Sequence, residues 1–165
     1  MKKLKTYCLA AACVFAVTTA SADVTVTMHL TAPTGEGKAI GTITAQDTKY
    51  GLLLTPNLSG LTPGAHGFHV HQNPSCDNGG MAAGGHLDPD KSGKHEGPYN
   101  AGHLGDLPAL MVDAQGDAKT PVLAPRLKLA DILNHSFMIH AGGDNYSDNP
   151  TMGGGGARIV CGVIK

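Results

Sequence analysis

Glycine and proline make up 33 of the 165 residues, and this abundance constrains the fold more than any other property of the sequence. Relative to alanine, glycine costs about 1 kcal/mol inside a helix and proline about 3 kcal/mol. No long segment has the apolar periodicity of an amphipathic helix, so a helical bundle is excluded. A hydrophobic content of 41% and a formal net charge of −1 argue equally against a disordered chain.

The N-terminal segment has the pattern of a secretory signal peptide. Lysines at positions 2, 3 and 5 precede an apolar stretch over 7–17, and small residues occupy 20–22. We expect cleavage after Ala22, which leaves a single domain over 23–165. The apolar stretch is too short to span a membrane. Lipid attachment at Cys13 is the alternative interpretation of this segment.

Removal of residues 1–22 changes the charge and the cysteine count. The segment carries three lysines and no acidic residue, so the formal charge of the expected mature chain is −4. This charge argues against a nucleic-acid partner, which would require a basic surface. Only Cys76 and Cys161 remain, and an even pair in an exported protein predicts one disulfide. Two separate buried thiols are the alternative.

Short segments with apolar and polar residues in alternation predict an all-β sandwich or barrel. The clearest is 24–30, where apolar residues occupy the even positions and polar residues the odd ones. The turn 113–117 predicts a hairpin between its flanking strands. The eight expected strands cover residues 24–30, 40–45, 50–54, 65–71, 109–112, 119–123, 134–140 and 157–164.

Two long segments do not fit strands. They cover 72–107 and 141–156, and both are rich in glycine, proline, aspartate and asparagine. A loop as long as the first is uncommon in a compact domain unless it has a function. Because both segments are full of side chains that bind metals, we expect them to build a functional site.

The strand 65–71 places histidines on both of its faces. Side chains two residues apart share a face, so His69 and His71 point one way and Phe68 and Val70 the other. The apolar pair should face the core, and the two imidazoles then face the long loop as a candidate metal site. His66 lies on the apolar side, where a structural hydrogen bond is the expected role.

Further candidate ligands follow in the two loops. Three imidazoles and one carboxylate suit tetrahedral zinc, and the first loop supplies His86, His95, His103 and Asp106. His140 begins the second loop and can join His69 and His71 in an all-imidazole set suited to copper. Two four-coordinate ions need eight ligands and only seven are available, so one imidazole must bridge them. We assign His29 and His135 to the surface.

The sequence resembles the copper/zinc superoxide dismutases of the bacterial, periplasmic type. The segments that carry the resemblance are 67–71, 84–86, 103–107 and 156–164, and the similarity spans almost the whole expected mature chain. It implies an eight-stranded Greek-key β-barrel or sandwich. It also implies copper and zinc as cofactors, superoxide as substrate, a periplasmic location, and a monomer or homodimer. No membrane partner is expected after cleavage.

The resemblance assigns roles to individual residues. His86 corresponds to the bridging imidazole, and Cys76 and Cys161 to the disulfide between the long loop and the last strand. The copper ligands correspond to His69, His71, His86 and His140, and the zinc ligands to His86, His95, His103 and Asp106.

Two further residues match the family outside the ligand sets. Arg158 corresponds to an arginine beside the copper, and Asp144 to a carboxylate that hydrogen-bonds one histidine of each metal. Arg158 and His86 are therefore the expected catalytic residues, with His86 as a proton store. The segment 141–157 contains no lysine, so we expect Lys91 and Lys94 to provide positive potential near the site.

A metal-binding module without activity and a structural domain are the alternative functions. The first would be expected to lack Arg158 or one copper ligand, and the second would tolerate the loss of several ligands, but none of these residues is missing.

Overall fold

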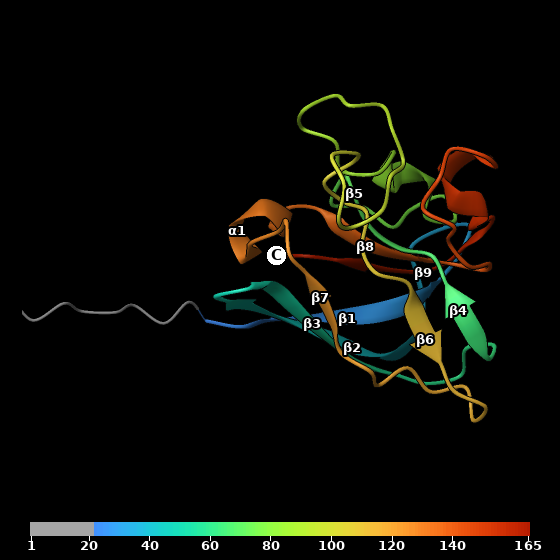
Figure 1. Ribbon diagram of the computed structural model, residues 1–165. Coiled ribbons are helices and arrows are strands. Elements are labelled where there is room, and N and C mark those ends of the chain that lie inside the picture. Colours follow the sequence, from blue (N-terminus) through green and yellow to red (C-terminus); the bar gives the residue numbers. More distant parts are fainter. Residues whose placement is uncertain (1–21) are drawn as a thin grey trace, which may run out of the picture.

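The computed structural model describes residues 22–165, so residues 1–21 of the predicted signal peptide lie outside the described residues. The domain is built from strands and long loops (Figure 1). The strands are β1 (Val24–Thr31), β2 (Glu36–Thr48), β3 (Gly51–Leu58), β4 (Gly64–His66), β5 (Phe68–His71), β6 (Leu110–Val112), β7 (Val122–Ala124), β8 (Ser136–His140) and β9 (Arg158–Val163). Three helical turns complete it: η1 (Met81–Ala83), α1 (Leu129–Ile132) and η2 (Thr151–Gly154).

The strands form a curled antiparallel sheet and a separate pair. The seven-stranded sheet has the order β5-β8-β9-β1-β2-β3-β7, and β4 pairs with β6. Buried side chains from both sheets belong to one apolar core, which includes Leu110 of β6, Ile43 of β2 and Phe68 of β5. The predicted all-β fold is therefore confirmed.

Strand β1 shows how the alternation in the sequence sets the inner face. Val26 and Met28 are buried, whereas Thr25 and Thr27 are exposed. Leu30 departs from the pattern and is partly exposed, after register shifts in the β1–β2 ladder at His29.

The predicted strand 65–71 is divided at Gly67. Its first part, β4, pairs with β6, and its second part, β5, pairs with β8. At the division, the Gly67 N–H donates to the Gly142 carbonyl and its own carbonyl accepts from the His140 N–H. The chain thus passes from one sheet to the other here, and one predicted strand becomes two.

The predicted hairpin at 113–117 is wrong, although the turn itself forms. Asp113 accepts from the Gln115 and Asp117 N–H groups, which closes the turn locally. The chain then separates, because Ala118 pairs with Leu58 and β7 pairs with β3 instead of β6. β7 therefore joins the seven-stranded sheet, whereas β6 pairs with β4.

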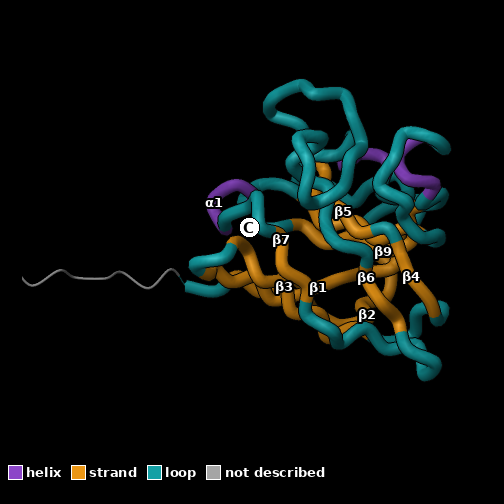
Figure 2. Tube along the Cα trace, viewed as in Figure 1, coloured by secondary structure: helices purple, strands orange, loops and turns teal. Residues whose placement is uncertain are grey.

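Both long loops gather at one end of the sheet (Figure 2). A disulfide between Cys76 and Cys161 ties the first loop to β9, which confirms the predicted pairing. Within residues 22–165, no helix is long and apolar enough to cross a membrane.

Candidate metal centre

Strand β5 carries the first two imidazoles of the site. His69 and His71 are buried on one face, while Phe68 and Val70 enter the core on the other, as predicted. The Phe68 ring lies 5.5 Å from the Phe137 ring of β8, which anchors the strand. The first long loop returns to β5 through isolated bridges, one of which pairs His71 with His86.

Four imidazoles meet beside β5, and we call them the first cluster: His69, His71, His86 and His140. Each offers a ring nitrogen within 4.8 Å of the others, and all four residues are buried. His86 and His69 stack with their ring centroids 3.9 Å apart. The structure therefore brings together the four residues that the sequence predicts for copper.

Hydrogen bonds fix which nitrogen of each ring faces the first cluster. The His71 Nδ1–H donates to the Gly84 carbonyl at 2.9 Å, and the His140 Nδ1–H donates to the Gly156 carbonyl at 3.1 Å. The Nε2 atoms of both rings thus keep a free lone pair. His69 donates from Nε2 to Asp144 at 2.7 Å, which leaves its Nδ1 free.

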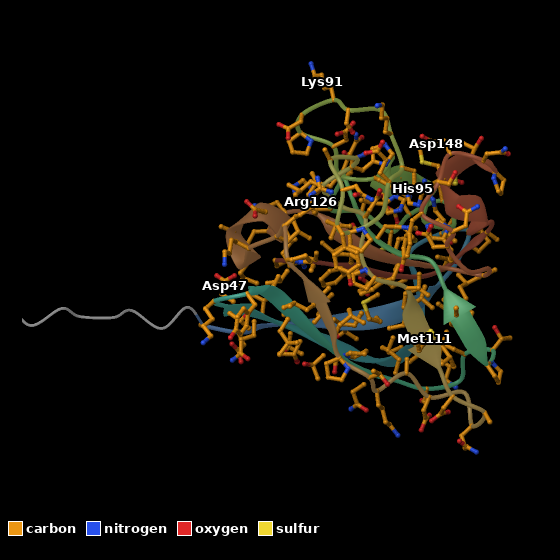
Figure 3. All side chains as sticks on the ribbon, viewed as in Figure 1. Asp47, Lys91, His95, Met111, Arg126 and Asp148 are labelled. Atoms are coloured by element: carbon orange, nitrogen blue, oxygen red, sulfur yellow. A yellow bond between two sulfur atoms is a disulfide. The ribbon has the colours of Figure 1, made fainter. Side chains whose placement is uncertain are left out.

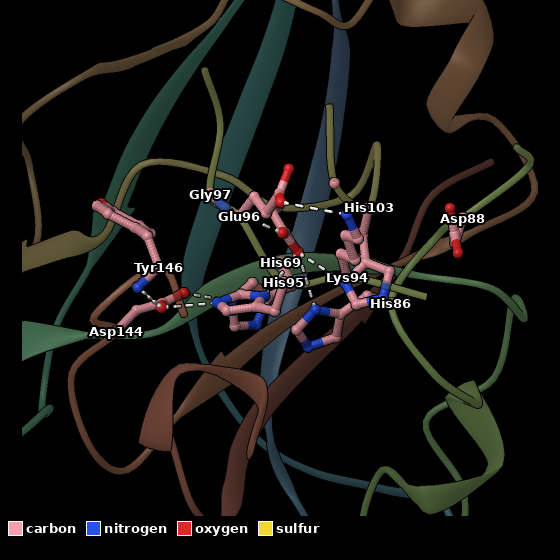
Figure 4. A network of polar contacts seen from close by, with 12 residues as sticks. His69, His86, Asp88, Lys94, His95, Glu96, Gly97, His103, Asp144 and Tyr146 are labelled. Atoms are coloured by element: carbon pink, nitrogen blue, oxygen red, sulfur yellow. Dashed lines mark hydrogen bonds and ion pairs between the residues drawn. The ribbon is translucent and has the colours of Figure 1, made fainter. Parts of the chain in front are cut away.

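The second cluster consists of His86, His95, His103 and Asp106. Its three histidines, labelled in Figure 4, surround one carboxylate oxygen of Asp106. Asp106 Oδ1 lies 2.9, 3.0 and 3.4 Å from the Nδ1 atoms of His86, His95 and His103 respectively. Four ligands about 2.0 to 2.1 Å from a tetrahedral ion lie about 3.3 Å from one another. The three distances from Asp106 Oδ1 are close to that value.

Asp144 connects the two clusters from the second long loop. Its Oδ2 accepts from His69 Nε2 and its Oδ1 from His95 Nε2, each at 2.7 Å. The Tyr146 N–H also donates to Oδ1, at 2.8 Å (Figure 4). The predicted contact with one histidine of each cluster is thus present, and it fixes the orientation of both rings.

The two clusters suit cations because they leave ring nitrogens without partners. Among the described residues, the buried side-chain nitrogen or oxygen atoms that lack a hydrogen bond are His69 Nδ1, His71 Nε2, His95 Nδ1, His103 Nδ1 and His140 Nε2. Buried polar atoms almost always have a partner, so five such atoms in one place indicate a binding site for a ligand. Imidazole nitrogen is a good ligand for both copper and zinc.

Burial and carboxylates move the pKa values of these imidazoles in opposite directions. Burial lowers the pKa of His69 to about 3 and that of His140 to about 4. Burial also opposes protonation of His95, but its contacts with Asp106 and Asp144 dominate and raise its pKa to about 9. Burial alone would raise the pKa of the Asp106 and Asp144 carboxyls. The imidazoles that contact each carboxylate, among them His95, instead hold both pKa values well below their usual range. The first cluster is thus kept neutral and ready to bind a metal.

A cavity of about 340 Å³ leads to the first cluster, and Arg158 is the charged side chain among its lining residues. The lining also includes His86, His140 and the two methionines Met81 and Met152. Arg158 donates to the Gly80 carbonyl at 2.6 Å and to the Gly84 carbonyl at 2.7 Å, which fixes its guanidinium. A larger hollow of about 420 Å³, beside His29 and Lys165, lies against β1 in the middle of the seven-stranded sheet, and its lining contains no such cluster.

The remaining predicted residues lie away from this cavity. Lys91 and Lys94 are exposed in the first loop, and Lys94 Nζ lies 4.0 Å from a Glu96 carboxylate oxygen. Figure 3 shows Lys91 near the tip of that loop. His66 is buried between the His140 and Thr62 carbonyls, which agrees with its predicted structural role.

No sequence pattern indicated a role for Arg126, which supports the second cluster from the β7–α1 connection. Its guanidinium donates to the His103 carbonyl at 3.1 Å and to the Gly102 carbonyl at 2.8 Å. Asp148 is a second such residue, because its carboxylate accepts from the His95 N–H at 3.2 Å. Neither contact follows from spacing in the sequence, since each joins segments distant along the chain.

Fold and site together define an all-β protein with two adjacent groups of buried side chains that could each hold a metal ion. Residues 39–164 match the family described as copper/zinc superoxide dismutase. Superoxide dismutase [Cu-Zn] 1 of Salmonella typhimurium is 57% identical over 152 residues, which is 86% of each chain.

Two solved structures are also similar. The Cu/Zn superoxide dismutase from Brucella abortus has a TM-score of 0.83 and 49% identity, and the match covers 87% of this chain and all of that one. The monomeric copper, zinc superoxide dismutase from Salmonella enterica has a TM-score of 0.78 and 51% identity over the same shares of the two chains. The chain belongs to the copper/zinc superoxide dismutase family, and it is an oxidoreductase that dismutates superoxide with copper and zinc.

Proposed function

We propose that the first cluster binds copper, that the second binds zinc, and that His86 bridges the two ions through its imidazole ring. The unpartnered ring nitrogens carry this proposal, because they belong to the two clusters and to no other part of residues 22–165. His86 contacts Asp106 through Nδ1, which leaves its Nε2 for the first cluster. One ring can thus supply a nitrogen to each ion.

His103, and not His69, is the proposed fourth ligand of the second cluster. Distance alone groups His69, and not His103, with His86, His95 and Asp106. However, His69 Nε2 is occupied by Asp144, and its Nδ1 is the atom that completes the first cluster. His103 Nδ1 has no hydrogen bond and lies 3.4 Å from Asp106 Oδ1, so it completes the second.

Arg158 and His86 are the proposed catalytic residues. When bound, copper supplies reversible one-electron chemistry and zinc supplies a fixed positive charge beside it. Arg158 lines the cavity with a guanidinium held in place by two carbonyls, so it can attract and orient the superoxide anion. Whenever its Nε2 is not bound to copper, His86 can hold a proton on that nitrogen and give it to the reduced product. Two superoxide ions and two protons thus become dioxygen and hydrogen peroxide.

The activity can be tested on the purified protein. Full copper and zinc loading should give superoxide-dependent activity, and selective removal of copper should abolish it while the zinc content stays constant. His86→Ala should lose the coupling between the sites, which the electronic spectrum of the bound copper reports. An active copper-free protein, or an unchanged copper spectrum in His86→Ala, would contradict the proposed roles.

Lys91 and Lys94 are proposed to attract the anionic substrate to a protein of net negative charge. Both are exposed, and screening in salt confines their effect to about 10 Å at 0.1 M ionic strength. Replacing both with glutamine should lower kcat/KM and flatten its dependence on ionic strength. The matched control replaces the exposed Lys38 and Lys119, which changes the net charge equally. An unchanged salt profile in the Lys91/Lys94 variant would overturn this role.

We propose that residues 1–22 direct export and that 23–165 form the mature enzyme in the periplasm, where it removes superoxide. The disulfide between Cys76 and Cys161 supports an oxidising compartment. Mass spectrometry of the protein from a periplasmic extract should give an N-terminus at Asp23. A lipid-modified N-terminus at Cys13 would instead support the lipoprotein alternative.

Of the two oligomeric states that we expect from the sequence, the monomer is supported by the Salmonella enterica relative, which is described as monomeric. Sedimentation velocity over a range of protein concentrations separates a monomer from a homodimer.

A further inference from the structure

Three methionines are exposed among the described residues, and two of them share one cavity. Met81 is 59% exposed, Met111 52% and Met152 38%. Met81 lies in η1 and Met152 in η2, yet both line the cavity that leads to His86 and His140. Figure 1 shows these two short helical turns at the same end of the molecule as the long loops. Met111 lies on β6, away from this cavity (Figure 3).

The backbone holds both cavity methionines in fixed positions. Met81 follows Gly80, whose carbonyl accepts from Arg158 and whose N–H donates to the carbonyl of the disulfide-bonded Cys76. Met152 has φ 53° and ψ 43°, in the left-handed region. For a residue other than glycine this conformation costs about 1–2 kcal/mol. Since its side chain remains partly exposed, burial in the core does not explain why a methionine occupies this position.

Thioether sulfur is a soft, uncharged ligand that favours Cu(I) over zinc and over harder ions. It carries no proton, so binding requires no deprotonation. Arg158 lines the same cavity, and its positive charge opposes a divalent ion more strongly than a monovalent one. Both properties favour Cu(I) as the ion that passes this opening.

We propose that Met81 and Met152 form a capture site for Cu(I) at the mouth of the cavity, from which the ion moves to the first cluster. The proposal rests on the proposed function, because it assumes that the first cluster is the copper site. It also gives a physical reason for sorting the two metals, since a thioether site retains copper and releases zinc. The capture site uses none of the ligands of either cluster.

Replacement of both methionines by leucine tests the sulfur atoms specifically, because leucine retains most of the apolar volume. The zinc-loaded, copper-free protein receives Cu(I) without oxygen from a coloured Cu(I)-chelator complex, and the loss of colour reports transfer. We expect Met81→Leu/Met152→Leu to load about tenfold more slowly, which is about 1.4 kcal/mol in the barrier. After air is admitted and oxygen oxidises the bound Cu(I) to Cu(II), its copper content and Cu(II) spectrum should equal those of the unaltered protein. Met111→Leu is the matched control and should load at the unaltered rate.

A second measurement observes binding directly. In protein labelled at the methionine methyl groups, Ag(I), a probe for Cu(I), should shift the NMR signals of Met81 and Met152 before that of Met111. Equal loading rates for the double variant and the unaltered protein would overturn the proposal. Equal slowing of Cu(I) and Cu(II) loading would also overturn it, because sulfur favours Cu(I). If the unaltered protein takes no copper from the chelator, the proposed function also fails. If it loads copper at the same rate as the double variant, only the proposed capture site fails.

Discussion

Replacing Asp144 with asparagine should weaken zinc binding more than copper binding. The carboxylate accepts two imidazole N–H groups at 2.7 Å, one from each cluster. An asparagine side chain has one acceptor oxygen and an NH2 group, so one imidazole must face a donor. His69 is held in the β5–β8 ladder, whereas His95 lies in a loop, so the orientation of His95 depends more on the carboxylate.

The expected magnitude follows from the lost contact. A hydrogen bond to a charged group contributes about 1.5–3 kcal/mol, and loss of a partner that orients a metal ligand lowers affinity about 10- to 100-fold. These values agree, since a tenfold change is about 1.4 kcal/mol. Zinc affinity, measured by competition with a coloured chelator, should therefore fall about 10- to 100-fold in Asp144→Asn.

Asp148→Asn is the matched control for this variant. It removes the same charge from the same loop, but its side-chain oxygen can still accept from the His95 N–H, as Asp148 does at 3.2 Å. The control should therefore retain zinc affinity. Equal zinc affinities for the two variants and the unaltered protein would refute the argument that Asp144 acts by accepting from both rings.

Three further predictions concern the supports of the site. Gly153→Ala should weaken zinc binding, because a Cβ at this position would meet Asp144 Oδ1 and, at 2.7 Å, His95 Nε2. Gly156→Ala is the control, because Gly156 has an equally positive φ but open space around it. Competition with a chelator should therefore show a larger loss of zinc affinity for Gly153→Ala. Arg126→Met should lower zinc affinity about tenfold by releasing two loop carbonyls, with the Cu(II) spectrum unchanged; wild-type zinc affinity would contradict this role. The urea midpoint of the chelator-treated protein should be highest near pH 6.5. Below that pH the unfolded chain protonates three imidazoles that burial keeps neutral in the folded chain, those of His69, His71 and His140. As the pH rises toward 9, the folded chain loses the stabilising proton of His95. A midpoint that rises steadily up to pH 9 would contradict the raised pKa of His95.

Local patterns in the sequence predicted the features that depend on neighbouring residues. The alternation in β1 gave the inner positions Val26 and Met28, and the alternation in β5 gave the face shared by His69 and His71. The number and kinds of possible ligands also predicted two metal sites that share one imidazole, and the resemblance to the family assigned that imidazole to His86.

Features that depend on contacts between distant segments were not predicted. The division at Gly67 and the separation of β6 from β7 are set by pairing with β8 and β3, which a local pattern does not contain. The role of Arg126 was not predicted either, because the two carbonyls to which it donates lie 23 and 24 residues away in the chain. The long loops acquire their shape from such contacts and from the ligands that they share.

Anomalous X-ray diffraction from crystals of the protein loaded with both metals would test the central claim most directly. Data collected at the copper and zinc absorption edges should show one ion in each cluster, with the His86 ring between them and a different nitrogen bound to each. The predicted copper lies with His69, His71 and His140, and the predicted zinc with His95, His103 and Asp106. A single ion shared by both clusters, or two ions with His86 bound to only one, would contradict the proposed centre.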